Sequence, residues 1–256
     1  MGGVVMGAGS STADAFVSAG PEIFTHMGIH LPLDPQIISP AIAESIRAGR
    51  YEKTEAKVLP GIIEPGERVV DVGGGLGFTA AVMARTGRAE RVVCVEAHPG
   101  LIPLIEAVRE LNAVDFEVRH AAVAPAPDGP TTPFYLAGHF WASSLLPMAQ
   151  ARLSGVAEIP ALSFADLVRA YAPTMYVIDI EVLKEFIAPA ADGLDGLDSI
   201  ALDGVAKVVV QTHQNVAGRR GVKRVFDWFS ARGFVYSPLH SRGDVVLFER
   251  LGGDGE

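Results

Sequence analysis

The feature that most constrains the fold is an alternation of strand-like and helix-like runs from residue 68 onward. The early strand-like runs are continuously apolar, which is typical of strands covered by helices on both faces. Strands that alternate with helices in this way predict a parallel, doubly wound sheet. The last two runs are separated only by a short loop, so they predict an antiparallel hairpin at one edge. The seven predicted strands are residues 68–72, 91–97, 116–123, 175–181, 207–213, 234–239 and 244–250, and the clearest helices are 78–86, 101–111, 162–171 and 182–190.

The remaining segments define a predicted domain organisation. Residues 1–28 begin with small and polar residues and predict a flexible tail, while residues 29–256 predict one domain without an internal linker. Within 29–65, Ser39-Pro40 marks the start of a first helix, and a second helix follows. We expect 29–65 to form a helical lid over a bound cofactor; a helix that only covers a sheet edge is the alternative. The lid would carry Tyr51, Glu52 and Glu55 at the start of its second helix.

Residues 121–160 interrupt the alternation with a stretch rich in proline and glycine. Insertions in doubly wound sheets tend to lie at the carboxyl ends of strands, where ligands bind. A surface hairpin is one interpretation of this segment. A wall of the substrate pocket near the active site is the other, because Phe140, Trp141, Ser143 and Ser144 place aromatic faces beside hydroxyls.

The run VVDVGGGLGFTAA places a glycine loop between the first strand and the first helix. Gly73, Gly75 and Gly77 follow the spacing G-x-G-x-G, one residue short of the dinucleotide fingerprint G-x-G-x-x-G. Asp71 lies at the end of the strand, where a carboxylate would repel a pyrophosphate but attract the ammonium and sulfonium of S-adenosylmethionine. Glu96 ends the next strand, where an acid can accept both ribose hydroxyls. The loop therefore predicts S-adenosylmethionine as the cofactor, with glycines that allow close backbone approach.

Several longer segments carry a family resemblance: YEKTEAKVLPGIIEPGERVVDVGGGLGFTA, VVCVEAHPGLIPLIEAVRELN, FWASSL, VIDIE and GVKRVFDWFSARGFVYSPL. Over about residues 40–250, the chain resembles the FkbM-type methyltransferases. The resemblance implies a Rossmann-like class I enzyme that uses S-adenosylmethionine to methylate a hydroxyl, often on a sugar or a sugar-bearing natural product. It implies cofactor contacts from Asp71, Gly73, Gly75, Gly77, Glu96 and Ala97, with Ala121 and Ala122 beside the adenine.

The catalytic candidates lie at the ends of the fourth and fifth predicted strands. Asp179 is the first candidate for the base that deprotonates or orients the acceptor hydroxyl, and a cap of the following helix is its alternative role. His213 is the second candidate, with a satisfied strand-end histidine as the alternative. Glu181 is either a pocket acid or a helix-start carboxylate favoured by the helix dipole.

The segments at the ends of the fourth and fifth strands, where the methyl acceptor would bind, depart from the family pattern. The fourth strand of the family runs into D-x-E-G-x-E, but here Val182 occupies the glycine position, and Lys184 replaces the last acid unless Glu185 takes its place. Gln211 also stands where a glutamate is common. Three functions therefore stay open: an O-methyltransferase, a methyltransferase-like protein that keeps the cofactor without turnover, and a nicotinamide-dependent dehydrogenase.

Composition bears on partners and location. The net charge is −9, which disfavours nucleic acid and anionic membranes as partners, so a small-molecule or sugar-like acceptor is predicted. Neither a signal peptide nor an 18-residue apolar run is found in the sequence, and the single cysteine, Cys94, fits a reducing cytoplasm. The histidines lack metal-ligand spacing, so no metal is predicted. Homo-oligomerisation is left open.

Overall fold

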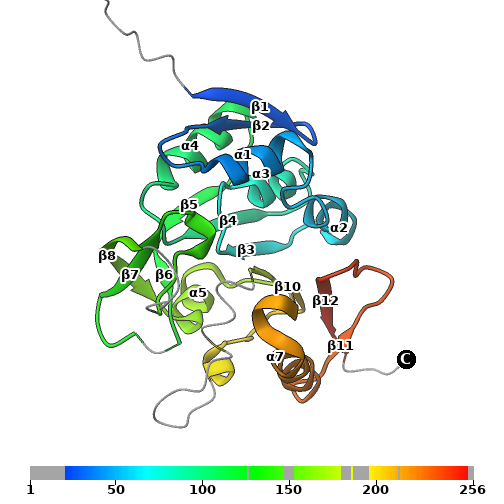
Figure 1. Cartoon of the computed structure of the whole chain (residues 1–256). Coiled ribbons are helices and arrows are strands. Elements are labelled where there is room, and N and C mark those ends of the chain that lie inside the picture. The colour runs from blue at the N-terminus through cyan, green and yellow to red at the C-terminus, as the bar shows by residue number, and fades with distance from the viewer. Residues whose placement is uncertain are drawn as a thin grey trace, which may run out of the picture.

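The computed structural model of the chain describes residues 21–125, 127–146, 153–179, 186, 196–212 and 214–252. Its centre is a seven-stranded sheet with the order β11-β12-β10-β9-β3-β4-β5 (Figure 1). The neighbouring strands from β10 to β5 pair in parallel, while β12 lies antiparallel between β10 and β11. The predicted doubly wound, mostly parallel sheet with an antiparallel C-terminal pair is confirmed. The strands are β3 (Arg68–Val72), β4 (Arg91–Glu96), β5 (Glu117–His120), β9 (Met175–Ile178), β10 (Lys207–Gln211), β11 (Phe234–Tyr236) and β12 (Val245–Arg250).

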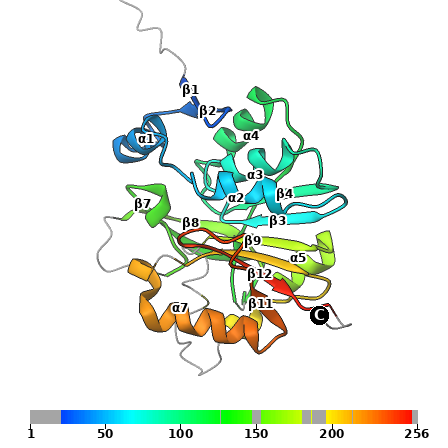
Figure 2. The same ribbon diagram turned by 90° about the vertical axis from the view of Figure 1, so that its right-hand side faces the viewer.

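Helices cover both faces of this sheet, so the fold has three layers (Figure 2). Successive residues of a strand point to opposite faces. On β3, Val69 joins the apolar cluster under the first set of helices, while Val70 and Val72 join the cluster under the second. Continuous apolar strands are therefore required here, as the sequence predicted. The first face carries α1 (Pro40–Arg47), α2 (Glu55–Ile62), α3 (Phe78–Ala84) and α4 (Ile102–Leu111), and the second carries α5 (Phe164–Tyr171), the 3₁₀ turn η2 (Gly196–Ser199) and α7 (Gln214–Ser230).

The N-terminal prediction needs correction. Residues that we predicted as tail up to 28, and as the start of a helical segment from 29, form an antiparallel hairpin of β1 (Glu22–His26) and β2 (Ile29–Leu33). Ile29 and Leu31 are fully buried against the core, and the Arg85 guanidinium donates to the carbonyl oxygen of Gly28 at 2.7 Å. Apolar burial against α3 and α4 therefore orders a segment whose composition alone looked weakly structured.

The insertion forms its own three-stranded sheet, in the order β6-β8-β7, from β6 (Ala122–Val123), β7 (Thr131–Ala137) and β8 (Leu153–Leu162), with the 3₁₀ turn η1 (Phe140–Ala142). The run predicted as one strand over 116–123 divides at Ala121, because its first part pairs with β4 and its last part with β8. We did not predict β8, since Gly155 and Pro160 interrupt its strand pattern.

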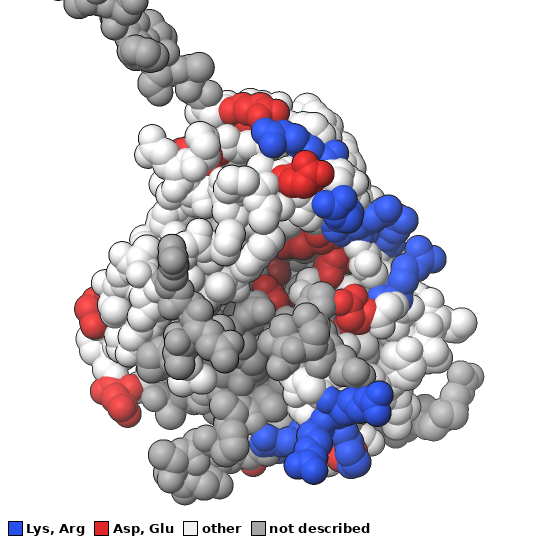
Figure 3. Space-filling view, in the orientation of Figure 1, with Lys and Arg blue, Asp and Glu red and all other residues white. Residues whose placement is uncertain are grey.

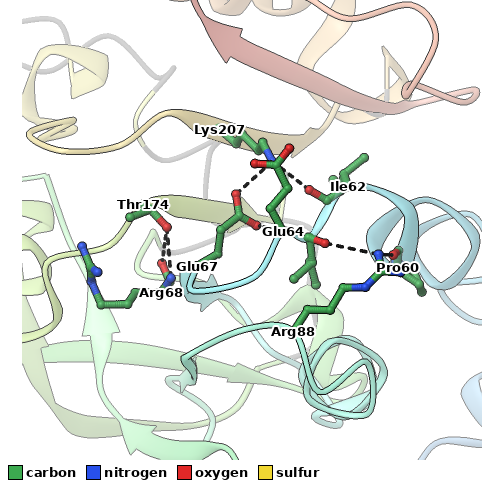
Figure 4. A network of polar contacts seen from close by, with 9 residues as sticks. Pro60, Ile62, Glu64, Glu67, Arg68, Arg88, Thr174 and Lys207 are labelled. Atoms are coloured by element: carbon green, nitrogen blue, oxygen red, sulfur yellow. Dashed lines mark hydrogen bonds and ion pairs between the residues drawn. The ribbon is translucent and has the colours of Figure 1, made fainter.

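A buried ion pair fastens α2 to the sheet (Figure 4). The Lys207 ammonium at the start of β10 donates to the Ile62 carbonyl oxygen at 2.9 Å and lies 2.9 Å from a Glu67 carboxylate oxygen and 3.2 Å from Glu64. Arg88 donates to the carbonyl oxygens of Pro60 and Ile63 at 3.3 and 3.4 Å. The C-terminal end of α2 is thus anchored, which fixes where its N-terminal end lies.

Candidate functional site

A cavity of about 660 Å³ opens at the carboxyl ends of β3, β4, β9 and β10. Its walls come from the loops after β3, β4 and β5, from the turn between α1 and α2, and from the insertion. Five carboxylates line it, against two basic side chains, those of Arg50 and Lys53. Figure 3 shows acidic atoms gathered in a central hollow of this face, with basic atoms along its rim. The inner surface therefore favours a ligand that carries positive charge; the five acids are Glu52, Glu55, Glu96, Asp179 and Asp244.

The backbone N–H groups of the four glycines in the loop donate to acceptors within the protein. Those of Gly73 and Gly74 both donate to the Val95 carbonyl oxygen, at 3.0 and 3.1 Å. Gly75 N–H donates to a Glu96 carboxylate oxygen at 2.9 Å, and Gly77 N–H to the Gly74 carbonyl oxygen at 2.7 Å. Phosphate recognition at such a loop needs free N–H donors. None of these four groups is free to bind a phosphate.

Glu96 is buried at the end of β4 and lines the cavity. One carboxylate oxygen accepts from Gly75 N–H at 2.9 Å and the other from His98 N–H at 2.7 Å. Burial raises the pKa of Glu96 to about 7, against the opposing effect of these backbone hydrogen bonds. Because an ionised carboxylate offers about four acceptor positions, roughly two remain for a ligand. A pair of neighbouring hydroxyls, as on a ribose, fits that capacity.

The structure places Asp71 and Gly77 outside the cavity wall. Asp71 is buried beneath the loop, outside the cavity wall, and its carboxylate accepts from the Thr79 hydroxyl at 2.6 Å. Burial raises the pKa of Asp71 to about 7. Gly77 also lies outside the wall, and a Cβ there would approach Ile105 Cγ2 at 2.8 Å. Both residues therefore support α3 and its packing, and their contacts with the cofactor stay predictions.

Gly74 is a structural residue that the sequence analysis did not single out. A Cβ at this position would lie 2.1 Å from the Cys94 sulfur. The single cysteine is fully buried under the loop, and burial raises the pKa of its thiol. The middle glycine of the run is thus required by packing against β4.

Other predicted cofactor residues lie together on the cavity wall. Gly73 and Gly75 face it from the loop, and Ala97, Ala121 and Ala122 form an apolar surface on the side of β5. Parallel pairing of β4 with β5 brings these alanines beside Glu96, although they come from separate parts of the chain.

The predicted acceptor residues divide into three groups. Asp179 lines the cavity, and its N–H donates to the Val72 carbonyl oxygen at 3.1 Å, which holds the end of β9 against β3. Trp141 and Ser143 line the cavity as well, although the Ser143 hydroxyl accepts from Ala137 N–H at 3.0 Å. Ser144 is only 1% exposed and does not contribute to the wall, because its backbone pairs with β7. Glu181 and His213 lie outside the described residues, as do Val182, Lys184 and Glu185.

Gln211 and Asp244 are among the wall residues that were not predicted as site residues. Gln211, noted only as a departure from the family pattern, donates to a Glu55 carboxylate oxygen at 2.6 Å and so joins β10 to the start of α2. Asp244 precedes β12, and its carbonyl oxygen accepts from Thr212 N–H at 2.8 Å. No local signal points to Asp244, since only the antiparallel insertion of β12 beside β10 brings it to the cavity.

The turn between α1 and α2 lies over the glycine loop. A Cβ at Gly75 would lie 3.0 Å from the Tyr51 hydroxyl oxygen and 3.6 Å from a Glu52 carboxylate oxygen. The position fits the predicted lid; whether the segment closes on a ligand stays a prediction.

Two further searches concern metals and membranes. Across the described part of the chain, no group of three or more histidine, cysteine, aspartate or glutamate side chains is arranged to hold a metal ion. Within the same residues, no helix combines the length and apolar character needed to cross a bilayer.

Comparison with known proteins gives one family match. The model of the protein-L-isoaspartate(D-aspartate) O-methyltransferases matches residues 45–129, which contain the glycine loop, Glu96 and the three alanines of the wall. The match covers about a third of the chain and leaves out Asp179 and the C-terminal strands. A search of the curated proteins gives no match.

Several solved structures are similar in part. The chain is 14% identical to TYW2 of M. jannaschii in complex with AdoMet, with 91% of this chain and 87% of that one covered at a TM-score of 0.45. It is 15% identical to Trm5b of Pyrococcus abyssi, with 91% and 56% covered and a TM-score of 0.47. Precorrin-6y C5,15-methyltransferase of Geobacter metallireducens is 9% identical, with 83% and 90% covered and a TM-score of 0.43. These scores lie below 0.5, and the assignment of the fold rests on strand order and pairing.

Proposed function

We propose that this protein is an S-adenosylmethionine-dependent methyltransferase. One observation carries the proposal. The glycine N–H groups of the loop are already hydrogen-bonded within the protein, while the neighbouring Glu96 carboxylate can still accept further hydrogen bonds from a ligand. Such a loop can approach a nucleoside closely, but its four glycine N–H groups are not available to a pyrophosphate. The five carboxylates of the wall favour a ligand with a sulfonium and an ammonium. The family match over residues 45–129 supports the same cofactor.

The cofactor would take the orientation that the wall residues offer. Glu96 would accept from the two ribose hydroxyls, and the adenine would lie on the apolar surface of Ala97, Ala121 and Ala122. The other end of the ligand would then extend toward β3 and β9, past Gly73 and Gly75. When bound, S-adenosylmethionine supplies a methyl group on a sulfonium, already activated for displacement.

The finer proposal is O-methylation of a hydroxyl on a small or sugar-like acceptor, as in the FkbM-type enzymes. Asp179 lines the cavity at the end of β9, on the side to which the reactive end of the cofactor would extend. In this proposal the Asp179 carboxylate would orient the acceptor hydroxyl toward the methyl group and take its proton, so that the acceptor oxygen could displace the sulfonium sulfur from the methyl carbon. Aromatic side chains of the insertion, including Phe134, Phe140 and Trp141, would form the outer wall of the acceptor pocket.

Two other functions compete with O-methylation. A nicotinamide-dependent dehydrogenase is disfavoured, because the four glycine N–H groups of the loop are bonded within the protein and acidic side chains outnumber basic ones on the cavity wall. A protein that keeps the cofactor without turnover is motivated by Val182, Lys184 and Gln211 in the acceptor half.

Calorimetric titration separates the first alternative, since S-adenosylhomocysteine should bind and NADH should not. A screen of hydroxyl acceptors with labelled methyl donor then tests turnover. In the active protein, Asp179→Asn should lower the rate by about 10²–10⁴, because the amide cannot act as a base. Affinity for S-adenosylhomocysteine should stay within about threefold of the parent, by calorimetry.

Asp115→Asn, an exposed aspartate just before β5, is the matched control and should change neither quantity. An Asp179→Asn variant that binds the cofactor poorly or unfolds would assign a structural role to the residue. A parent protein that binds S-adenosylhomocysteine but methylates no hydroxyl in the screen would support the binding-protein alternative.

The predicted absence of a nucleic-acid partner stays a prediction. The overall charge is negative, but α7 carries four basic residues between positions 219 and 224. Figure 3 shows a separate group of basic atoms below the hollow on the same face. A small acceptor remains our proposal, because the cavity wall itself is acidic.

A further inference from the structure

Two buried polar atoms above the glycine loop lack a well-formed hydrogen bond. Among the described residues, neither the Tyr51 hydroxyl oxygen nor the Oε2 atom of Glu52 completes a hydrogen bond of good geometry, although the two side chains lie close enough for each to shift the pKa of the other. Tyr51 is 7% exposed, and both side chains line the cavity. Buried polar atoms are nearly always hydrogen-bonded, since leaving one unsatisfied is costly. Two neighbouring exceptions on a cavity wall indicate that a ligand supplies the partner.

The fold holds this pair in place at a cost in backbone conformation. Glu52 has a φ of 42°, in the left-handed region that side chains other than glycine rarely adopt. Strained residues of this kind cluster at ligand sites, where the surrounding structure enforces them. The adjoining turn is held by His26 of the N-terminal hairpin, whose Nε2 donates to the Tyr51 carbonyl oxygen at 2.7 Å and whose ring packs tilted against Phe78 with the ring centroids 4.8 Å apart.

The electrostatic surroundings of Glu52 favour a positively charged ligand group. Burial raises its pKa well above the ordinary value, and the negative charges of Glu55, Asp71 and Asp179 raise it further, while the neighbouring Tyr51 hydroxyl opposes the shift. No basic side chain is among the groups that shift it. A positively charged ligand group beside this carboxylate would relieve both the repulsion and the missing hydrogen bond.

We propose that Tyr51 and Glu52 bind the ammonium group at the amino-acid end of the methyl donor. The inference rests on the proposed function, because the position of the ammonium follows from the ribose on Glu96 and the adenine toward β5. That arrangement directs the amino-acid end over Gly75, where the two side chains approach within 3.0 and 3.6 Å of a Cβ position. Asp71, the sequence candidate for this contact, is engaged by the Thr79 hydroxyl beneath the loop.

Two ligands that differ only at the amino-acid end test the inference. S-adenosylhomocysteine carries the ammonium, whereas 5′-methylthioadenosine keeps the nucleoside and the thioether but lacks the amino-acid group. By calorimetry, Glu52→Gln should bind S-adenosylhomocysteine about ten- to a hundredfold more weakly. The same variant should bind 5′-methylthioadenosine within about twofold of the parent. Tyr51→Phe should show the same selectivity, with a loss of roughly three- to tenfold.

Thermal denaturation distinguishes a ligand-binding role of Glu52 from a structural one, because the substitution should lower the melting temperature only if the side chain stabilises the fold. An amide is cheaper to bury than a carboxylate, so ligand-free Glu52→Gln should melt at or above the parent temperature. Glu44→Gln, an exposed glutamate of α1 outside the cavity wall, controls for the loss of one charge and should change neither ligand affinity.

Equal losses for both ligands, or a lower melting temperature with Glu52→Gln, would make the pair structural and overturn the inference. An unchanged affinity for S-adenosylhomocysteine in both variants would overturn it as well. If the parent protein binds neither nucleoside, the proposed function itself fails and this inference fails with it, a result distinct from selective binding that the variants leave intact.

Discussion

Replacing Glu96 by glutamine is the most informative single change, because this side chain serves the loop and the ligand at once. Its two oxygens each accept one backbone N–H, from Gly75 at 2.9 Å and from His98 at 2.7 Å. A glutamine side chain has one acceptor oxygen and one donor NH₂. One of the two buried N–H groups must then face another donor. An unsatisfied buried group costs about 1–3 kcal/mol, and for a chain of this size each kcal/mol lowers Tm by roughly 2–4 °C.

The expected fall in Tm for Glu96→Gln is therefore about 2–12 °C. Ligand affinity should fall independently, because the ribose hydroxyls lose a charged acceptor worth about 1.5–3 kcal/mol, or roughly one to two orders of magnitude in Kd. Both should be measured at about pH 8, above the Glu96 pKa of about 7, so that the parent carboxylate is ionised.

Glu90→Gln is the matched control, since this exposed glutamate lies before β4 and outside the cavity wall. It should change neither Tm nor affinity for S-adenosylhomocysteine measurably. If Glu96→Gln lowers Tm but leaves the affinity unchanged, Glu96 only braces the loop and the ribose contact is refuted. If it changes neither quantity, the account of the loop hydrogen bonds is wrong.

Three further predictions concern stability. Gly74→Ala should lower the free energy of unfolding by about 1–3 kcal/mol, because the new methyl group overpacks against the Cys94 sulfur. Adding Cys94→Ala should restore most of this loss in urea unfolding. A double variant as unstable as the single one would contradict the packing argument. Lys207→Met should lower the free energy of unfolding by about 3–5 kcal/mol, because it leaves the buried Glu67 carboxylate without its ion pair. Adding Glu67→Gln should recover much of this loss, and a loss below about 1 kcal/mol for Lys207→Met would show that the pair is weak. The Asp71 carboxyl keeps its proton in the folded protein up to a pKa of about 7 but loses it in the unfolded chain near its ordinary value of 3.8, so its contribution to stability declines as pH rises through this window. The Tm of Asp71→Asn minus that of the parent should therefore increase from about pH 4 to pH 7, and parallel profiles would refute the raised pKa.

The fold class was accessible from sequence because its signals are local and periodic. Runs such as Arg68–Val72 and Arg91–Glu96 are apolar on both sides, and only strands with two covered faces need that pattern. The hairpin of residues 22–33 was not accessible, since its order comes from Ile29 and Leu31 packing on helices that lie far along the chain.

The candidate site divides in the same way. A glycine loop and an acid at the end of the next strand lie within about thirty residues, and parallel pairing of neighbouring strands places them together whatever the rest of the chain does. The sequence therefore determined the cavity floor, including Gly73, Gly75 and Glu96. It could not distinguish Asp71 from Glu96, because both are acids near strand ends. Only the packing of α3, which brings the Thr79 hydroxyl to Asp71, places that side chain beneath the loop and outside the cavity wall.

The walls and the mouth of the cavity were decided by tertiary structure. Asp244 reaches the cavity because β12 enters the sheet antiparallel beside β10, a pairing that no residue near Asp244 specifies. Tyr51 and Glu52 were visible in the sequence as the start of a helix, but their missing hydrogen bonds and the strained Glu52 backbone exist only once His26 holds the turn. Periodicity and spacing act over a few residues, whereas burial, charge and unsatisfied hydrogen bonds at a site depend on neighbours that distant parts of the chain supply.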